Sequence, residues 1–284
     1  GQYSTSEQVL SKLEDAHPIV GHILNYRGLK KLLTTYAEAL PTYIDPATGK
    51  IHTHFNQAEA ATGRLSSLNP NLQNIPIRTA EGRNIRKAFI TGDPDYEFFS
   101  ADYSQVELRL MAHLSGTPEL INAFLKGEDV HAATASKIYH VPLDEVTPEM
   151  RRRAKTANFG IIYGISAWGL AERLKISRKE GKELIEGYFA LYPGVKRYME
   201  ESVEKARKKG YVETIMGRRR YLRDINSRNA VVRGVAERNA VNAPIQGSAA
   251  DIIKKAMICI HQKLKERGLR SKMILQVHDE LNFK

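Results

Sequence analysis

The sequence is poor in cysteine: Cys259 is the only one among 284 residues. A single cysteine excludes an intrachain disulfide and a cysteine-based zinc site, and it favours a reducing, intracellular environment. No run approaches the 18 or so apolar residues of a transmembrane helix, so no membrane segment is predicted. The sequence also lacks internal repeats and low-complexity segments. Hydrophobic residues nevertheless make up 42%, which is ordinary for a globular protein with a core.

Acidic residues are fewer than basic ones. The chain has 32 Asp and Glu against 43 Lys and Arg, which gives a formal net charge of +11. An excess of this size indicates a polyanionic partner, and it favours nucleic acid over an anionic membrane. A basic surface without a partner is the alternative at this point.

Strand patterns occur early in the chain and again at its end. Residues 49–57 alternate like a half-exposed strand, and residues 96–102 are typical of a short buried strand. Residues 211–222 predict a hairpin, and residues 272–283 predict a final strand. Because helical patterns fill most of the chain between them, we expect an α+β fold. It would have a small antiparallel sheet and a long helical insertion.

The helical patterns carry clear start signals. Thr147 and Pro148 are typical of an N-cap followed by the first helical residue. Ser177 and Glu180 have the spacing of a capping box. A long helix beginning near residue 232 is expected to break near Pro244, because proline lacks the amide hydrogen that a helix interior needs.

Two acidic sites lie on predicted strands. Asp102 ends the strand at 96–102, and Asp279 and Glu280 lie in the last strand. Two strands of one sheet could place both aspartates side by side, where their charges would repel without a cation. Oxygen ligands suit Mg²⁺, and paired metal sites serve phosphoryl transfer. The alternative is an ordinary solvated strand edge.

A second pattern lies on the helix predicted for residues 148–163. Arg151, Lys155, Phe159 and Tyr163 recur every four residues and therefore share one broad helical face. Two cations followed by two aromatic rings fit a triphosphate and a base. An amphipathic helix with a basic end and core-facing rings is the alternative.

Two further segments could contact nucleic acid. The tract "GRRRYLRD" contains Arg219 and Arg220, which could bind backbone phosphates. Arg238, Asn242 and Gln246 lie on either side of the expected break, where amides could reach acceptors in the minor groove. Helix capping explains the two amides equally well.

Taken together, these segments resemble the family A DNA polymerases. "DYSQVELR" is similar to the first palm motif, "RRRAKTANFGIIYG" to the fingers motif, and "QVHDEL" to the third motif. "TGRLSSLNPNLQNIPIR" and "NAPIQGSAADIIK" are also close to the family pattern. The resemblance runs from about Tyr3 to Phe283.

The resemblance implies a right-hand polymerase fold, with an antiparallel-sheet palm and a large helical fingers insertion. Residues 1–112 would hold the end of the thumb and the first part of the palm. Residues 113–230 would form the fingers, and residues 231–284 the second part of the palm. We therefore interpret the chain as a fragment of a longer protein, with the thumb mostly absent and the palm truncated at its C-terminus.

The resemblance also implies roles for single residues. Asp102, Asp279 and the backbone carbonyl of Tyr103 would hold two Mg²⁺ ions, and Lys155 would assist catalysis. Glu107, against Tyr163, would exclude a ribose 2′-OH. The residues expected to contact the incoming deoxynucleotide are Arg78, Gln105, Glu107, His131, Arg151, Lys155, Phe159 and Tyr163. Those expected to contact primer–template DNA are Arg64, Arg219, Arg220, Arg238, Asn242, Gln246 and His278.

The implied function is template-directed addition of deoxynucleotides to a primer 3′-OH, in replication and repair. A monomer in the bacterial cytoplasm, associated with the nucleoid, is expected. The alternative is a DNA-binding fragment with little turnover, because thumb and palm elements are missing. A single-subunit RNA polymerase is disfavoured, because a gate against ribose at Glu107 would defeat RNA synthesis.

Overall fold

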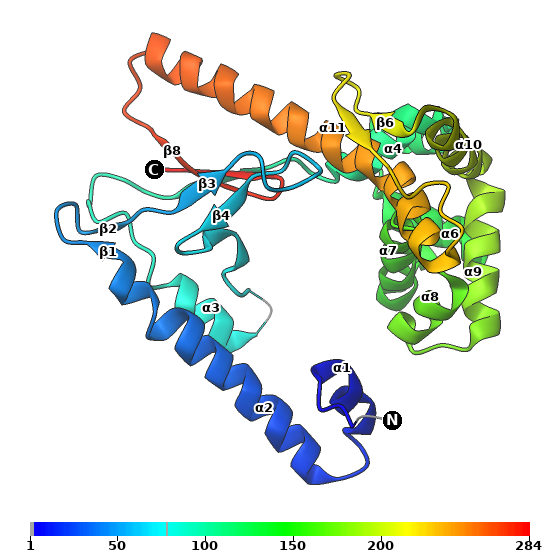
Figure 1. The fold of residues 1–284 in the computed structure, drawn as a ribbon, viewed down its shortest axis with the longest axis horizontal. Helices are drawn as coiled ribbons and strands as arrows, with labels where there is room; N and C mark the ends of the chain where they lie inside the picture. The colour runs from blue at the N-terminus through cyan, green and yellow to red at the C-terminus, as the bar shows by residue number, and fades with distance from the viewer. Residues whose placement is uncertain (1–2, 78) are drawn as a thin grey trace.

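Helices and small antiparallel sheets alternate along the chain, as expected for an α+β protein. The computed structural model describes residues 3–77 and 79–284, so the prediction for Arg78 lies outside the described residues. Figure 1 shows most helices packed on one side and most of the short strands on the other. Helix α11 (Ala230–Glu266) joins the two, running from the helical side towards the last strands.

The sheet that carries the predicted acidic residues has three strands in the order β5-β9-β8. They are β5 (Phe99–Asp102), β8 (Met273–Val277) and β9 (Glu280–Phe283). All pairings are antiparallel, and Asp102 lies opposite Glu280. The expected contact between the early and the final strand is therefore present.

The single strand expected over residues 272–283 is instead a hairpin. It turns at His278 and Asp279, and His278 has a left-handed backbone with φ 55. Such a backbone suits a tight turn between antiparallel strands. The Gln276 side-chain amide also donates a hydrogen bond to the His278 carbonyl, which stabilises the turn. Asp279 is therefore a turn residue and not a strand residue.

The prediction of a buried strand at 96–102 was wrong. Every residue of β5 is exposed, and the Phe99 side chain is 64% exposed. β5 is an edge strand that pairs only with β9, and its main ring contact is Phe99 with Phe283, at 5.9 Å between centroids. Asp102 is consequently exposed. Among the residues that the structure describes, the buried carboxylate is Glu107, at 6% exposed.

In the described residues, three two-stranded sheets complete the strand structure. The expected strand at 49–57 is interrupted at residues 52–53, and its two halves pair with different neighbours. The predicted hairpin at 211–222 is confirmed. The strands are β1 (Ile44–Asp45) with β2 (Lys50–Ile51), β3 (His54–Asn56) with β4 (Ser66–Leu68), and β6 (Tyr211–Glu213) with β7 (Arg219–Tyr221).

The helices vary in length from one turn to ten. Before the three-stranded sheet lie α1 (Glu7–Leu10), α2 (Pro18–Leu32) and α3 (Ala80–Arg86). After β5 come α4 (Val106–Ser115), α5 (Pro118–Leu125), α6 (Val130–Tyr139), α7 (Pro148–Ile162), α8 (Ala167–Leu174), α9 (Arg178–Leu191) and α10 (Pro193–Lys209). Short 3₁₀ or π turns connect several of these.

The predicted helix starts are confirmed at two positions. The Thr147 hydroxyl accepts a hydrogen bond from the Met150 amide, with Pro148 as the first helical residue of α7. The Ser177 and Glu180 side chains make both bonds of a capping box at the start of α9. Each signal is local, and each fixes a helix end within one residue.

The expected break at Pro244 was wrong, because α11 continues through it. Proline removes one backbone hydrogen bond. The loss is tolerated because the helix is buried on both sides of the proline, where packing holds it in place. Arg238, Asn242 and Gln246 consequently lie four residues apart on one face of an unbroken helix.

The largest hydrophobic core joins α4, α7, α9, α10 and α11. Leu108, Ile161, Tyr188, Val195 and Ile245 are each at most 2% exposed there. This core fixes α4 against the end of α7, which is the arrangement on which the candidate site depends. Over the part of the chain that the structure describes, no helix is long and apolar enough to cross a bilayer.

Candidate active site

The two predicted aspartates lie side by side at one end of the three-stranded sheet. The register opposes Asp102 to Glu280, and the next amide, of Tyr103, donates to the Asp279 carbonyl at 3.0 Å. The pKa of Asp102 is raised, first by partial burial and then by the negative charges of Asp279 and Glu280. We call Asp102, Asp279 and Glu280 the acidic edge.

The acidic edge offers the ligands that Mg²⁺ prefers. Its donors are carboxylate oxygens, and the Tyr103 carbonyl accepts one hydrogen bond, from Val106, which leaves a second lone pair. Asp279 Oδ1 is buried without a hydrogen bond. A divalent cation would satisfy that oxygen and remove the repulsion that raises the Asp102 pKa.

Few protein groups could coordinate Mg²⁺ at the acidic edge. In the described ranges, no three His, Cys, Asp or Glu side chains gather in a metal-binding arrangement. Two aspartates and a carbonyl would leave coordination positions for water or phosphate oxygens, which is how Mg²⁺ is commonly held at phosphate-transfer sites. The donor set thus fits a cation shared with a substrate.

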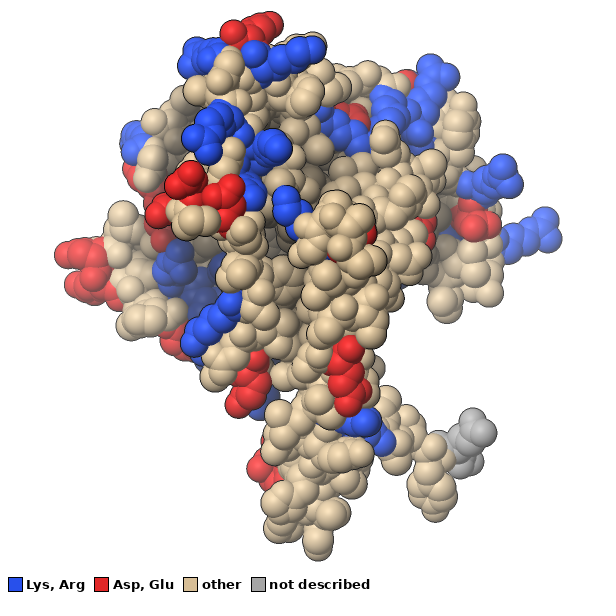
Figure 2. Space-filling view, turned by 90° about the vertical axis from the view of Figure 1, so that its left-hand side faces the viewer, with Lys and Arg blue, Asp and Glu red and all other residues tan. Residues whose placement is uncertain are grey.

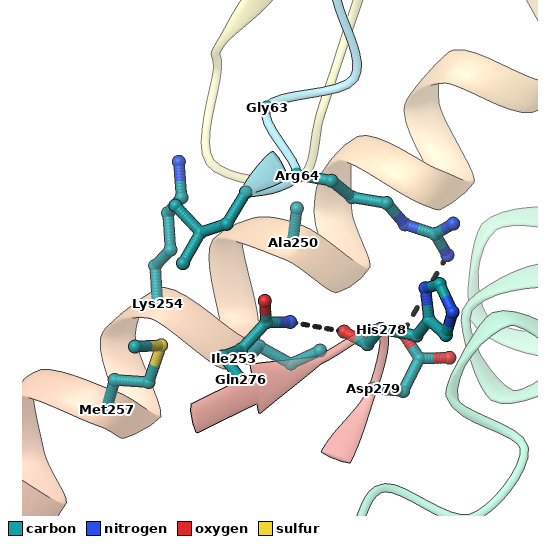
Figure 3. Close-up of a pocket in the computed structure, with 10 residues that line it drawn as sticks. Gly63, Arg64, Ala250, Ile253, Lys254, Met257, Gln276, His278 and Asp279 are labelled. Carbon is teal, nitrogen blue, oxygen red and sulfur yellow. Dashed lines mark hydrogen bonds and ion pairs between the residues drawn. The ribbon is translucent and has the colours of Figure 1, made fainter. Parts of the chain in front are cut away.

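Arg64 connects the acidic edge to Glu107. Figure 3 shows its side chain extending past His278 towards Asp279. One guanidinium nitrogen, Nη2, lies 2.7 Å from Glu107 Oε1 and 3.7 Å from Asp279 Oδ1. One arginine therefore holds two carboxylates from separate segments in a single charged group.

Glu107 has a second partner, Tyr163, at the end of α7. The Tyr163 hydroxyl donates a hydrogen bond to the Glu107 carboxylate, so the predicted contact between these two residues is present. Burial raises the pKa of Tyr163, and the hydrogen bond and charge of Glu107 raise it further. Tyr163 therefore remains a neutral donor at physiological pH.

The face of α7 that carries the four-residue repeat ends at this contact. Lys155 is exposed and forms no salt bridge with a described residue. Arg151 is paired instead, with Nε 2.7 Å from Asp129 Oδ2. The half-buried Phe159 ring lies 5.6 Å from the ring of His131. One unpaired and one paired cation thus precede the two rings.

His131 is more deeply buried than its predicted role suggests. It is 2% exposed, and the Asn158 amide lies 3.0 Å from its Nδ1. Burial lowers the His131 pKa to about 4, with the charges of Arg151 and Lys155 adding to the effect and Asp129 opposing it. At neutral pH this imidazole could offer a phosphate an N–H group but no charge.

The predicted face of α11 lies beside the end of α7. A Cβ at Gly164 would lie 2.8 Å from Arg238 Cγ, so the Arg238 side chain lies directly against the Gly164 backbone. A side-chain hydrogen bond between Gln246 and Tyr163 lowers the pKa of Tyr163, against the larger effects of burial and of Glu107. Buried oxygens without hydrogen bonds occur on Asn242 and on Gln105, the residue before α4. Both are acceptors without a hydrogen-bond partner among the described residues.

Arg219 and Arg220, on the hairpin of β6 and β7, make their contacts away from the acidic edge. Arg219 pairs with Glu213, at 3.0 Å between Nε and Oε1, and its guanidinium lies 4.5 Å from the centre of the Tyr211 ring. Arg220 is half-buried, and burial lowers its pKa. No contact recorded for the described residues brings either to the acidic edge. His278, in contrast, is exposed directly beside Asp279.

One functional candidate escaped the sequence analysis. Arg218, the first arginine of the "GRRRYLRD" tract, contacts Asp251 and Gly247 on α11 and Thr62 in the loop before β4. Its only sequence signal was its place in a basic tract that was assigned to DNA contacts.

The surface charge is unevenly distributed. In Figure 2, Lys and Arg side chains surround a hollow in the upper part of the face shown, and the lower part is mostly uncharged. This face therefore offers basic side chains that a polyanion could contact.

Comparisons with known proteins show which family this chain is similar to. The chain matches DNA polymerase family A over residues 1–284. It is 59% identical to DNA polymerase I of Geobacillus stearothermophilus over 98% of this chain and 32% of that protein. DNA polymerase I of Bacillus subtilis is 56% identical over 99% of this chain and 32% of that protein. The chain thus spans about a third of the length of these relatives.

A solved structure is similar throughout. The POL domain of Pol1 from M. smegmatis, in a complex with DNA primer-template and dNTP, superposes with a TM-score of 0.94 at 53% identity. The similarity covers 99% of this chain and 50% of the mycobacterial one.

Proposed function

This chain belongs to DNA polymerase family A, and on that premise we propose that it carries the polymerising site of a DNA-directed DNA polymerase. The reaction is addition of a deoxynucleotide to a primer 3′-OH, directed by a template, in replication and repair. The observation that carries the proposal is the position of Asp102 beside Asp279, which Arg64 joins to Glu107 and Tyr163.

We assign the palm to residues 1–112 and 231–284, with the end of the thumb at the start, and the fingers to residues 113–230. The packing of α7 in an all-helical core supports the assignment, as does its connection through Tyr163, Glu107 and Arg64 to the acidic edge. Primer–template DNA and deoxynucleoside triphosphates are the proposed partners. The similar mycobacterial POL domain is in a complex with a DNA primer-template and dNTP, which supports both. The proposed active form is a monomer in the bacterial cytoplasm, near the nucleoid.

Asp102, Asp279 and the Tyr103 carbonyl would hold two Mg²⁺ ions. When bound, the ions would lower the pKa of the primer hydroxyl and neutralise charge on the phosphates. Lys155 would bind the triphosphate directly, whereas Arg151 would exchange Asp129 for a phosphate. Phe159 and Tyr163 would lie against the sugar and the base.

The remaining proposed contacts are with the sugar of the nucleotide and with primer–template DNA. Glu107 occupies the space beside Tyr163, where a ribose 2′-OH would need to fit. The residues proposed to contact primer–template DNA are Arg64, Arg219, Arg220, Arg238, Asn242, Gln246 and His278. The proposed mechanism is in-line attack by the primer hydroxyl, with α7 closing over a correctly paired nucleotide.

Primer extension tests the function. The chain is incubated with primed DNA template, Mg²⁺ and four deoxynucleotides, beside Asp102→Ala and a matched control, Asp95→Ala, which changes an exposed loop acid. Extension by the wild type and the control, but not by Asp102→Ala, is expected. Equal extension by all three would refute the site. Absence of extension with salt-sensitive DNA binding would favour the DNA-binding fragment.

A further inference from the structure

Arg218 joins three segments that are distant in sequence. Its Nε donates to Asp251 Oδ1 on α11 at 2.9 Å. Its Nη2 donates to the Thr62 carbonyl at 2.7 Å and to the Gly247 carbonyl at 3.1 Å. The arginine itself comes from the hairpin between β6 and β7. A fixed, planar fork of donors can serve three acceptors in this way, and a lysine ammonium cannot.

The segment held by Arg218 leads directly to Arg64. Gly63 separates the bonded Thr62 carbonyl from Arg64, and it has a left-handed backbone with φ 82. A Cβ at Gly63 would lie 2.5 Å from Arg218 Cζ, so the guanidinium lies flat against this glycine. The backbone that presents Arg64 is thus fixed from one side by Arg218.

Arg218 also lies against a glycine of α11, Gly247. A Cβ at Gly247 would lie 3.1 Å from Arg218 Nη2, and Gly247 follows Gln246 directly. Arg218 therefore sits between the loop before Arg64 and the helix that carries Gln246 and Asp251. Figure 3 shows Gly63 and Arg64 lying over this part of α11, near Ala250.

We propose that Arg218 is a positioning residue: by holding the Thr62 carbonyl and Asp251, it aims the Arg64 guanidinium at Glu107 and Asp279. The inference rests on the proposed function, because it assigns Arg218 to the polymerising site. It differs from the prediction for this tract, which was contact with the DNA backbone. Three of the five donors of Arg218 are already bonded within the protein, so a phosphate would have to displace them.

A double-mutant cycle tests the coupling. Arg218→Lys keeps the charge but loses the fork, and Arg64→Ala removes the group that is aimed. We expect Arg218→Lys to slow primer extension by about tenfold or more, because a displacement of about 1 Å can cost ~100-fold. The double variant should be no slower than Arg64→Ala alone. Multiplying effects would overturn the proposal.

Two further variants separate positioning from general damage. Gly63→Ala disturbs the same contact from the other side and should not add to Arg218→Lys. Arg207→Lys is the matched control, because Arg207 also binds α11, through Glu237 at 2.6 Å. It should extend primers like the wild type. If Arg207→Lys slowed primer extension equally, the loss of any ion pair to α11 would be enough to slow it. That result would overturn the proposal.

Hydrogen exchange provides a readout that does not depend on catalysis. Amides of residues 62–66 should exchange faster in Arg218→Lys than in the wild type or in Arg207→Lys. Unchanged exchange would overturn the positioning role even if the chain proved to be a polymerase. Faster exchange in a chain that extends no primer would preserve the positioning role and refute the proposed function instead.

Discussion

The hydroxyl of Tyr163, the residue that ends α7, donates a hydrogen bond to the carboxylate of Glu107 in the first turn of α4. Arg64 bonds the other oxygen of the same carboxylate at 2.7 Å. A carboxylate that is 6% exposed needs such partners, because an unpaired buried charge costs several kcal/mol. Glu107 is therefore held in place, and its volume is a fixed part of the site.

A fixed volume beside Tyr163 predicts sugar selection. Glu107→Ala should raise the rate of ribonucleotide incorporation relative to deoxyribonucleotide, because it frees the space for a 2′-OH. Glu107→Gln keeps the volume and should retain most of the preference. Single-turnover incorporation of matched ribo- and deoxyribonucleotides measures the ratio. An unchanged ratio in Glu107→Ala would rule out the gate.

The acidic edge is expected to lower the stability of the folded protein at neutral pH. The pKa of Asp102 is raised in the folded protein, so the folded state binds this proton more tightly than the unfolded state. The associated stability is present below the ordinary carboxyl pKa of 3.8 and is lost as pH rises through the raised value. Asp102→Asn should therefore raise the melting temperature at pH 7, and the gain should shrink towards acidic pH.

Addition of Mg²⁺ should reverse that ranking. A cation at the acidic edge binds the folded state and needs the Asp102 carboxylate, so it should raise the melting temperature of the wild type more than that of Asp102→Asn. Asp95→Asn serves as the control and should respond like the wild type. Equal Mg²⁺ responses in all three proteins would contradict a cation at this edge.

Buried His131 predicts a pH dependence of the opposite sign. Its pKa is lowered to about 4 from an ordinary value of 6.5, so the unfolded state takes up the proton first as pH falls. Stability should therefore decline between pH 6.5 and pH 4. His131→Gln should flatten this decline, measured by chemical denaturation, whereas His113→Gln, at an exposed position, should not. An equally steep decline in His131→Gln would contradict the assignment.

Short-range features of this protein could be predicted from sequence. The caps at Thr147 and Ser177 depend on neighbours within three residues, and both are present. The approach of Asp102 to Asp279 was also predicted, because one sheet could pair the two strand patterns that contain them. A match to family motifs made that pairing specific.

Features set by tertiary packing could not be predicted in this way. Pro244 is a helix breaker locally, yet burial on both sides keeps α11 continuous. The apolar letters around Phe99 indicate a buried strand, but burial depends on what covers an edge. Arg218 appears in sequence as one of several arginines, and only the fold brings Thr62 and Asp251 to it.

The hairpin arginines predict different salt responses. DNA affinity should fall with salt, with a log–log slope of about −0.9 for each phosphate contact. Arg220 pairs with no described acid, so Arg220→Gln should make the slope shallower by about 1. Arg219 is already paired with Glu213, and DNA would first have to break that pair. Arg219→Gln should therefore change the slope less. Fluorescence anisotropy of primer–template across a salt series measures both. A slope unchanged by Arg220→Gln would place the DNA backbone away from this hairpin.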